Sequence, residues 1–258
     1  MKKRTRRRLS NILYRLFIAI LLIVFALCTF QLYVLWTEKE VVVKREKAIT
    51  EKVVTKDKYL EPDWEALRAQ NPDIIGWIYV PDCDINFPLV YRSGDNKRYL
   101  STDASGYYDE YGAIFLDGFA NADFSDMNSV IYGHSVLTGG RFTNLKYFVA
   151  QDFFDSHPYF YLLTPAKTWR CKVYAFARVP SNSIHYQTSF TEDELNQVAL
   201  QSMYSRTLDE VGYNPEIPDS NHFATLSTCD LSYGLNSNRR IVLSGYMKEY
   251  TKRIKLKE

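Results

Sequence analysis

The sequence predicts one N-terminal transmembrane helix followed by a mainly β domain that folds as a barrel or a sandwich. Leu16–Thr37 is a run of 22 residues without a charged side chain, and as a helix it covers about 33 Å, enough to cross a bilayer. Beyond it, short runs rich in β-branched and aromatic residues alternate with turn-forming residues. The composition, 46% hydrophobic and 24% charged, is that of a globular protein and argues against disorder.

The first 15 residues form a basic tail with seven Lys or Arg and no acid. Subtracting this +7 from the net charge of +2 leaves about −5 for the rest, so a nucleic-acid-binding domain is not expected. The apolar run at 16–37 has no Ala-x-Ala-like site and continues to Trp36, which favours an uncleaved anchor. Because positive charge stays inside, we expect a single-pass protein of the cell membrane with a cytoplasmic N-terminus and an extracellular domain.

Residues 38–61 mix both charge signs without a sustained apolar stripe, which predicts a solvated and partly helical stalk. A short helix is expected near Trp64, directly after Pro62. The folded domain is then expected over residues 62–250, a size suited to one core, with a basic C-terminal tail at 251–258.

The strands of this domain are predicted from local patterns. They are Ile74–Val80, Ile85–Tyr91, Ala113–Asp117, Ser129–Tyr132, Tyr159–Leu163, Arg170–Ala177, Phe223–Thr228 and Arg240–Tyr246. Alternation in Arg170–Ala177 places Cys171, Val173 and Ala175 on one face, so Cys171 is expected to be a packed core thiol.

Two helical stretches interrupt the strands. Asn144–Phe154 is predicted as a short helical region, and Thr191–Tyr204 as a longer helix. Thr191 and Glu194 have the spacing of a capping box at the start of the second one.

Four cysteines, at 28, 83, 171 and 229, bear on the chemistry. The first lies in the anchor, which leaves an odd number outside the cell. No Cys/Cys or Cys/His pair has metal-ligand spacing, and there is no Gly-rich phosphate loop, so no metal or other cofactor is expected.

Cys229 ends a predicted strand, and Arg240 begins the next one after ten residues that are rich in turn formers. If the two strands pair antiparallel, Cys229 and Arg240 meet at one rim of the sheet. A neighbouring guanidinium favours the nucleophilic thiolate, and its fixed donors can stabilise an oxyanion in acyl transfer. Arg239 is the neighbouring alternative, but Arg240 directly precedes the apolar Ile241 and is favoured by strand register.

A nucleophilic thiol also needs an acid to protonate its leaving group, and His134 is the candidate because it follows a predicted strand and Gly133. Ser227 and Asp230 flank the thiol and are candidate substrate contacts. Taken one at a time, a core thiol, a structural histidine and a surface arginine are the commoner roles of such residues.

Taken together, these residues resemble the sortases of Gram-positive bacteria. The resemblance rests on Thr225-Leu226-Ser227-Thr228-Cys229, on Arg240 before an apolar strand, and on Tyr132-Gly133-His134 upstream. It implies an eight-stranded β-barrel over residues 62–248 and a catalytic triad of His134, Cys229 and Arg240. The helix near Trp64, the helix at Thr191–Tyr204 and the sequence of the Cys229 motif are similar to class B.

The resemblance implies a cysteine transpeptidase that forms a thioester with the Thr of a sorting signal. Class B members typically recognise an Asn-Pro-Gln-Thr-Asn-like signal on surface proteins and join them to a peptidoglycan amine, while some polymerise pili. Two other interpretations stay open: a cysteine protease in which water resolves the acyl-enzyme, and a non-catalytic binding protein with one membrane span in which the Cys, His and Arg are coincidental.

Overall fold

The N-terminal helix α1 spans Lys2–Thr50 in a computed structural model that describes residues 2–137, 139–194, 222–234 and 237–256. Within α1, the segment Leu13–Val34 is 22 residues long and apolar enough to cross a membrane. The chain divides into two compact units, Met1–Ala48 and Ile49–Glu258.

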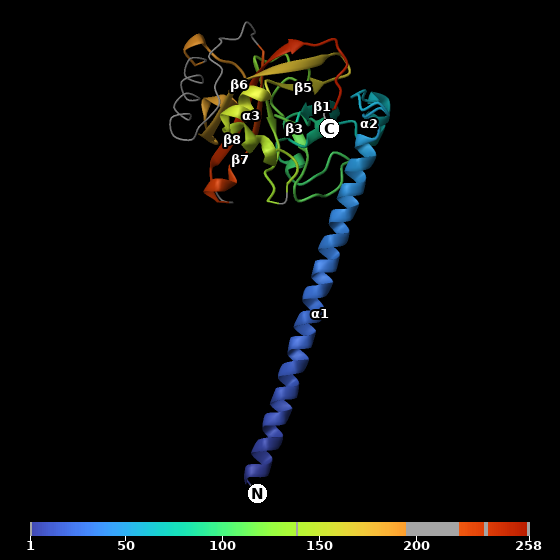
Figure 1. Cartoon of the computed structure of the whole chain (residues 1–258), viewed down its shortest axis with the longest axis vertical. Helices are drawn as coiled ribbons and strands as arrows, with labels where there is room; N and C mark the ends of the chain where they lie inside the picture. Colours follow the sequence, from blue (N-terminus) through green and yellow to red (C-terminus); the bar gives the residue numbers. More distant parts are fainter. Residues whose placement is uncertain (1, 138, 195–221, 235–236, 257–258) are drawn as a thin grey trace. The chain divides into compact units, whose positions relative to one another are not determined.

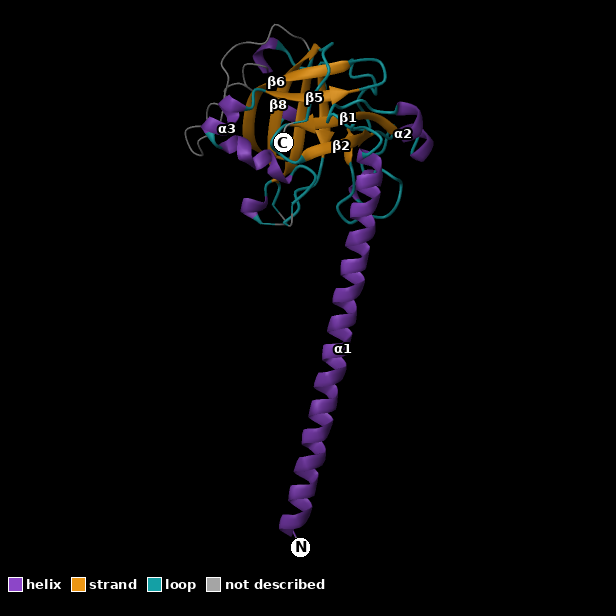
Figure 2. Ribbon diagram, turned by 45° about the vertical axis from the view of Figure 1, so that its right-hand side comes forward, coloured by secondary structure: helices purple, strands orange, loops and turns teal. Residues whose placement is uncertain are grey.

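The second unit is built around a closed barrel of eight strands (Figures 1 and 2), which decides for the barrel over the sandwich. The strands are β1 Ile74–Val80, β2 Ile85–Val90, β3 Ile114–Leu116, β4 Asn128–Tyr132, β5 Tyr159–Leu163, β6 Thr168–Pro180, β7 Phe223–Cys229 and β8 Arg239–Glu249. Around the barrel their order is β1-β2-β3-β4-β7-β8-β6-β5, with β2–β3 and β4–β7 parallel. Each strand coincides with one of the predicted runs to within a few residues at its ends.

Short helices connect the strands. They are α2 Trp64–Gln70, α3 Gln151–Ser156 and the 3₁₀-helices η1 Arg98–Leu100, η2 Thr143–Val149, η3 Ile184–Tyr186 and η4 Leu231–Tyr233. The helical region predicted at Asn144–Phe154 is therefore found as η2 followed by α3.

The predicted capping box is also formed. The Thr191 N–H donates to Glu194 Oε2 at 2.8 Å, and the Glu194 N–H donates to Thr191 Oγ1 at 3.3 Å. The rest of the helix predicted to Tyr204 lies outside the described residues.

One face assignment in β6 is wrong. Cys171 and Val173 are buried in the main core as predicted, but Phe176 joins them there in place of Ala175. The register between β6 and β8 shifts between Val173 and Ala175, so the alternation of sides changes at that irregularity. Ala175 packs instead in a separate cluster with Phe223.

The compact unit begins earlier than the expected boundary at residue 62. Ile49, Val53 and Leu60 are 2%, 1% and 4% exposed and pack in one cluster with Trp77. At the other end, Ile254 joins the same cluster, so neither 49–61 nor 251–256 is a solvated extension. A few buried apolar residues among many charged ones do not give a pattern that sequence analysis recognises.

Candidate active site

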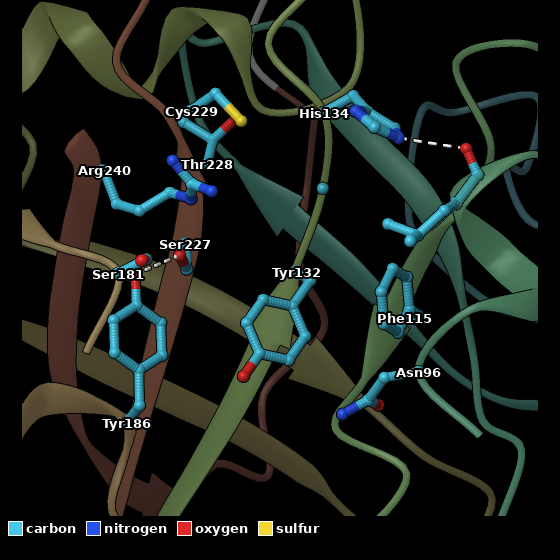
Figure 3. A pocket seen from close by; sticks show the side chains of 12 residues that line it. Asn96, Phe115, Tyr132, His134, Ser181, Tyr186, Ser227, Thr228, Cys229 and Arg240 are labelled. Carbon is cyan, nitrogen blue, oxygen red and sulfur yellow. Dashed lines mark hydrogen bonds between the residues drawn. The ribbon is translucent and has the colours of Figure 1, made fainter. Parts of the chain in front are cut away.

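A pocket of about 350 Å³ brings together His134, Cys229 and Arg240 (Figure 3). Its lining also includes Asn96, Leu100, Phe115, Tyr132, Gly133, Ser181, Tyr186, Ser227 and Thr228. The pocket lies at the ends of β4 and β7 and the start of β8. Cys229 is the last residue of β7, Arg240 is the second residue of β8, and His134 follows the end of β4 by two residues.

The β7–β8 pair fixes the thiol and the guanidinium. Cys229 and Arg240 are direct partners in its antiparallel register, as the sequence predicts. Nη1 of Arg240 donates to the carbonyl oxygens of Ser237 and Arg239, at 3.1 and 2.9 Å. Within the described residues its Nε and Nη2 groups have no acceptor, and Figure 3 shows the guanidinium close to the Cys229 side chain.

Arg239 has a different environment. It is absent from the pocket lining, and its guanidinium lies over the ring of Tyr233, 5.4 Å from the ring centroid. Strand register therefore places Arg240, and not Arg239, at the pocket, since neighbouring residues of a strand point to opposite faces.

His134 is held by the backbone on both sides. Gly133 donates its N–H to Ser227 O at 3.1 Å, which ties the end of β4 to β7. A side chain at Gly133 is excluded, because a Cβ there would lie 2.8 Å from the Phe142 ring. The imidazole Nε2 lies 3.0 Å from Leu100 O, and Figure 3 shows the Cys229 sulfur facing the other side of the ring.

Two tyrosines form a wall of the pocket. The rings of Tyr132 and Tyr186 stack with centroids 6.2 Å apart. Tyr132 donates to Asp117 Oδ2 at 2.9 Å, and the Tyr186 hydroxyl lies 2.8 Å from Ser227 Oγ. Burial raises the pKa of both phenols, and the negative charge of Asp117 raises that of Tyr132 further. Both side chains therefore stay protonated at neutral pH.

The three cysteines of the barrel unit differ in access. Cys229 is partly exposed and lines the pocket, while Cys83 and Cys171 are 1% and 0% exposed. Burial and the neighbouring Asp82 raise the pKa of the Cys83 thiol to about 12, and burial raises the pKa of Cys171. Cys171 is thus the packed core thiol that the sequence predicts.

Comparisons with known proteins agree on one family. The sortase B of Listeria monocytogenes is 28% identical over 181 residues, which are 68% of this chain and 70% of that protein. The sortase B of Staphylococcus aureus is 24% identical over 213 residues, 80% of this chain and 86% of that protein. No protein-family model matches the sequence.

Solved structures show the same fold. The substrate complex of S. aureus sortase B aligns with a TM-score of 0.70 at 21% identity, over 83% of this chain and all of that one. Sortase B of Clostridium perfringens aligns with a TM-score of 0.60 at 25% identity, over 71% of this chain and 98% of that one. Sequence relatives and solved structures together support a class B sortase.

Of the two candidate substrate contacts, one lines the pocket and one does not. Ser227 is at the pocket, although its hydroxyl is already engaged by Tyr186. Asp230 is 3% exposed and absent from the lining. Its carboxylate accepts from the Ser232 N–H and hydroxyl and lies 3.3 Å from the Arg178 guanidinium, contacts that account for its burial without a substrate.

Several residues that line the pocket were not singled out from the sequence. Asn96 and Leu100 come from the segment between β2 and β3, and Ser181 and Tyr186 come from the segment after β6. These segments have no strand or helix periodicity, so only the tertiary structure reveals that they reach the pocket. Among the residues that the structure describes, no group of three or more His, Cys, Asp or Glu is arranged to hold a metal ion.

Proposed function

We propose that this chain is a membrane-anchored cysteine transpeptidase that cleaves a C-terminal sorting signal after Thr and transfers the protein to an amine of the cell wall. The observation that supports this best is the direct strand pairing of Cys229 with Arg240 at a pocket that His134 also lines. A thiol, a cation with directed hydrogen-bond donors and an imidazole are the groups that acyl transfer requires.

In the first step, Cys229 Sγ attacks the carbonyl carbon of the Thr residue, and the C–N bond to the next residue breaks. His134 gives a proton to the departing amine, while the Nε and Nη2 donors of Arg240 bind the oxygen that becomes negative in the transition state. In the second step, an acceptor amine attacks the thioester and gives a proton to His134. The C–S bond breaks, and the products are a new amide and the free Cys229 sulfur, with the proton from the amine shared by the Cys229–His134 pair as it was before the first step.

His134 is the proton carrier in this scheme because the other titratable side chains at the pocket are poorly suited. The raised pKa values of Tyr132 and Tyr186 keep both phenols neutral, with hydroxyls that already bond to Asp117 and Ser227. Arg240 does not lose its proton in proteins. An imidazole is the side chain whose ordinary titration range suits proton exchange near neutral pH.

The substrates that we propose are based on those of the sortase B relatives. S. aureus sortase B has been solved as a substrate complex, and a sortase B has been solved with triglycine, a peptide that carries a free amine. For this chain we propose surface proteins with an Asn-Pro-Gln-Thr-Asn-like signal as acyl donors and a peptidoglycan amine as the acceptor. A pilin amine in place of the peptidoglycan amine is the alternative acceptor.

The membrane topology is part of the proposal. Leu13–Val34 crosses the membrane, the seven basic residues of the first 15 stay in the cytoplasm, and the barrel lies outside, where surface proteins and cell wall meet. Protease added to intact cells is expected to degrade the barrel and spare the basic tail. Protection of the barrel would reverse the orientation.

The test uses the purified chain with a panel of sorting peptides, with and without triglycine, and mass spectrometry of enzyme and products. Cys229→Ala is expected to abolish both the covalent acyl-enzyme and turnover, because the thiol is the proposed nucleophile. Cys83→Ala and Cys171→Ala are the matched controls, and we expect them to retain activity wherever they stay folded.

The outcomes separate the open alternatives. Transfer to triglycine supports the transpeptidase, and hydrolysis at the same rate with and without triglycine identifies a cysteine protease. An alkylation rate of Cys229 no faster than that of buried thiols, with no turnover of any peptide, would identify a binding protein. Turnover by folded Cys229→Ala would refute the assignment of the nucleophile.

A further inference from the structure

The imidazole of His134 is fixed by one contact from outside its own strand. Its Nε2 lies 3.0 Å from Leu100 O. A carbonyl oxygen only accepts hydrogen bonds, so this contact requires the proton to be on Nε2. Nδ1 is then the nitrogen left for proton exchange in the pocket, where Figure 3 shows the ring facing Cys229. The position of the Leu100 carbonyl therefore determines which nitrogen can act.

Leu100 belongs to residues 92–112, which connect β2 to β3 and are called loop 92–112 below. The start of the loop is tied to the β3–β4 turn, because Asn96 bonds to Asp117 Oδ1 at 3.0 Å and accepts from the Gly118 N–H at 2.6 Å. These side-chain contacts, together with the backbone bond from the Gly94 N–H to Gly118 O at 2.7 Å, hold the start of the loop beside the pocket.

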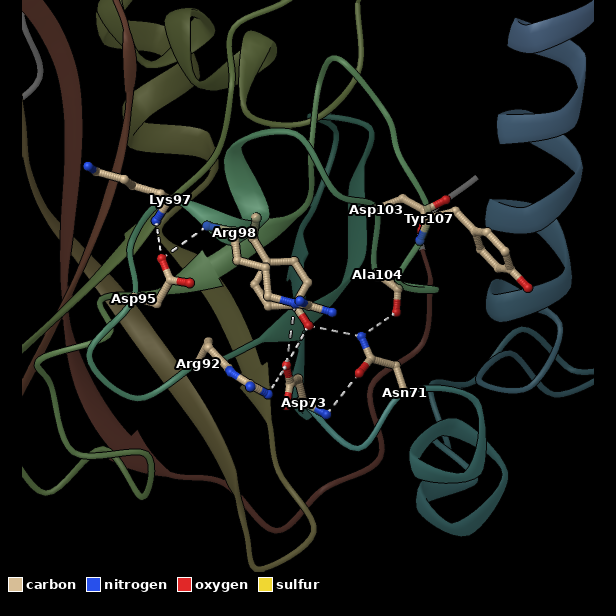
Figure 4. Close-up of polar contacts among 10 residues, drawn as sticks. Asn71, Asp73, Arg92, Asp95, Lys97, Arg98, Asp103, Ala104 and Tyr107 are labelled. Atoms are coloured by element: carbon tan, nitrogen blue, oxygen red, sulfur yellow. Dashed lines mark hydrogen bonds and ion pairs between the residues drawn. The ribbon is translucent and has the colours of Figure 1, made fainter.

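The middle of the loop is held by a polar cluster in which Tyr99 bonds to Asn71 and Asp73, and Figure 4 shows these two partners beside Ala104. Tyr99 is 1% exposed, and its hydroxyl donates to Asp73 Oδ2 at 2.8 Å. Asn71 Nδ2 donates to the same hydroxyl and to Ala104 O, each at 3.0 Å. Tyr99 directly precedes Leu100. The cluster therefore holds the residue next to the one whose carbonyl oxygen contacts His134.

The end of the loop is held by a buried ion pair. Arg141 Nη2 lies 2.6 Å from Asp109 Oδ2, and the two side chains are only 8% and 3% exposed. Arg141 Nε also donates to Gly112 O at 2.8 Å. Gly112 packs directly on the Leu100 peptide, since a Cβ added there would lie 2.8 Å from both Leu100 C and Leu100 O.

Arg141 is at the same time part of the segment that carries His134. Phe142, its neighbour, donates its N–H to His134 O at 3.0 Å, and Ser135 and Arg141 form an isolated β-bridge. A continuous path thus runs from His134 through Arg141 and Gly112 to Leu100 and back to the imidazole. The ion pair joins the two segments whose relative position sets the Leu100–His134 contact.

We propose that Asp109 and Arg141 are positioning residues that keep the proton of His134 on Nε2 and its Nδ1 toward the thiol. This rests on the proposed role of His134 as the proton carrier. Neither residue lines the pocket, so neither touches the substrate. Charged partners that are buried and bonded to each other resist rearrangement more than exposed ones do, which suits such a role.

The test is Asp109→Asn, which keeps the size of the side chain and one oxygen acceptor but removes the charge. We expect kcat on a sorting peptide to fall about 10- to 100-fold, because small displacements of a reacting group have effects of that size. KM is expected to change less than kcat does, since Asp109 itself does not line the pocket. In ¹⁵N-histidine-labelled protein, the His134 signals are expected to change from the Nε2-protonated tautomer alone to a mixture of both tautomers, with assignment by comparison with His134→Gln.

A second variant tests the inference if Asp109→Asn does not fold. Arg141→Lys keeps the charge but cannot reach both Asp109 and Gly112 with a planar fork, so the same changes are expected at smaller size. Val173→Ala, in the barrel core and outside both segments, controls for lower stability, and Glu61→Gln breaks the exposed ion pair with Arg253 as a charge control. Both controls are expected to keep kcat and the tautomer of the parent chain.

The outcomes distinguish this inference from the proposed function. An unchanged His134 tautomer in a folded Asp109→Asn protein overturns the positioning role. A changed tautomer with unchanged kcat supports the positioning role and refutes His134 as proton carrier. If Val173→Ala loses as much kcat as Asp109→Asn for the same fall in melting temperature, the inference is also overturned, because the effect is then one of stability.

Discussion

The two sides of the pocket are built in different ways. On one side, Cys229 and Arg240 are partners in the β7–β8 ladder, where many backbone hydrogen bonds fix their relation. On the other, His134 depends on Leu100, and loop 92–112 is held by a few side chains. A ladder tolerates the loss of one contact, whereas a loop held by single contacts does not. The side of Cys229, the proposed nucleophile, is therefore fixed redundantly, and the side of His134, the proposed acid and called the acid side below, is the more sensitive one.

The sensitive side also depends on a distant part of the chain. Tyr99 and Ala104 of loop 92–112 pack in the same buried cluster as Ile49, Val53 and Leu60. The segment 49–60 is therefore part of the support for the loop, although its charged composition indicates a stalk.

The largest expected effect comes from breaking that support. A chain that starts at residue 62 lacks Ile49, Val53 and Leu60, which are 2%, 1% and 4% exposed. At about 1.5 to 3 kcal/mol for each buried side chain, the free energy of unfolding is expected to fall by roughly 4 to 9 kcal/mol. Because whole domains have about 5 to 15 kcal/mol, most of the stability is lost. Urea unfolding of the chains from residue 44 and from residue 62 measures the difference.

Activity measured on the same two proteins tests the comparison itself. If the acid side is the sensitive one, any folded fraction of the shorter chain is expected to alkylate at Cys229 normally and to turn over peptide slowly. Equal stability of the two chains would show that 49–61 is a stalk after all.

The next effect tests the ladder side. Arg240→Lys keeps the charge but loses the planar fork, so we expect kcat/KM to fall by roughly 10², equivalent to about 2.7 kcal/mol, as for one lost oxyanion donor. Arg239→Lys is the matched control one residue away, and it should change kcat/KM by less than about threefold, as an exposed cation does. Equal effects would mean that charge alone matters, and the reverse order would assign the role to Arg239.

The fold and the β7–β8 side could be predicted from the sequence because their signals are local. Period-two alternation marks the strands, and an antiparallel pair with a short connection places Cys229 opposite Arg240 without further knowledge. The same rule failed inside β6, where the irregularity after Val173 changes the side of each following residue and no residue type announces it.

The acid side could be predicted only as far as His134 itself. Leu100, which contacts the imidazole, lies 34 residues from His134 in the sequence. Asp109 lies 32 residues from its partner Arg141. Arg141 and Asp109 are ordinary surface residue types, and only the folded chain shows them buried and paired. The role of Ile49 and Val53 is hidden for the same reason, because two apolar residues among charges give no period.

The smallest expected effect concerns Tyr186, which forms the pocket wall beside β7. It tests the comparison by a change of pH. His185 is 1% exposed in η3, directly before Tyr186, and its Nδ1 lies 2.8 Å from Ser183 Oγ. Burial lowers its pKa from 6.5 to about 4. Between these values the unfolded chain binds a proton at His185 and the folded chain does not, so acid favours unfolding. Its contribution to stability is complete above pH 6.5 and is lost as the pH falls.

We expect this one group to lower the free energy of unfolding by about 2 kcal/mol between pH 6.5 and pH 5, at about 1.4 kcal/mol per pH unit. His185→Gln cannot titrate, so the difference between the two proteins in urea unfolding at several pH values isolates the effect; equal slopes would refute it. Protonation should loosen η3 and with it the bond from Tyr186 to Ser227, while the Leu100–His134 contact is unaffected. Because only the β7 side of the pocket responds, the tautomer of His134 should be the same in the parent chain and in His185→Gln at equal pH. A tautomer that changes as His185 becomes charged would mean that the two sides of the pocket are coupled.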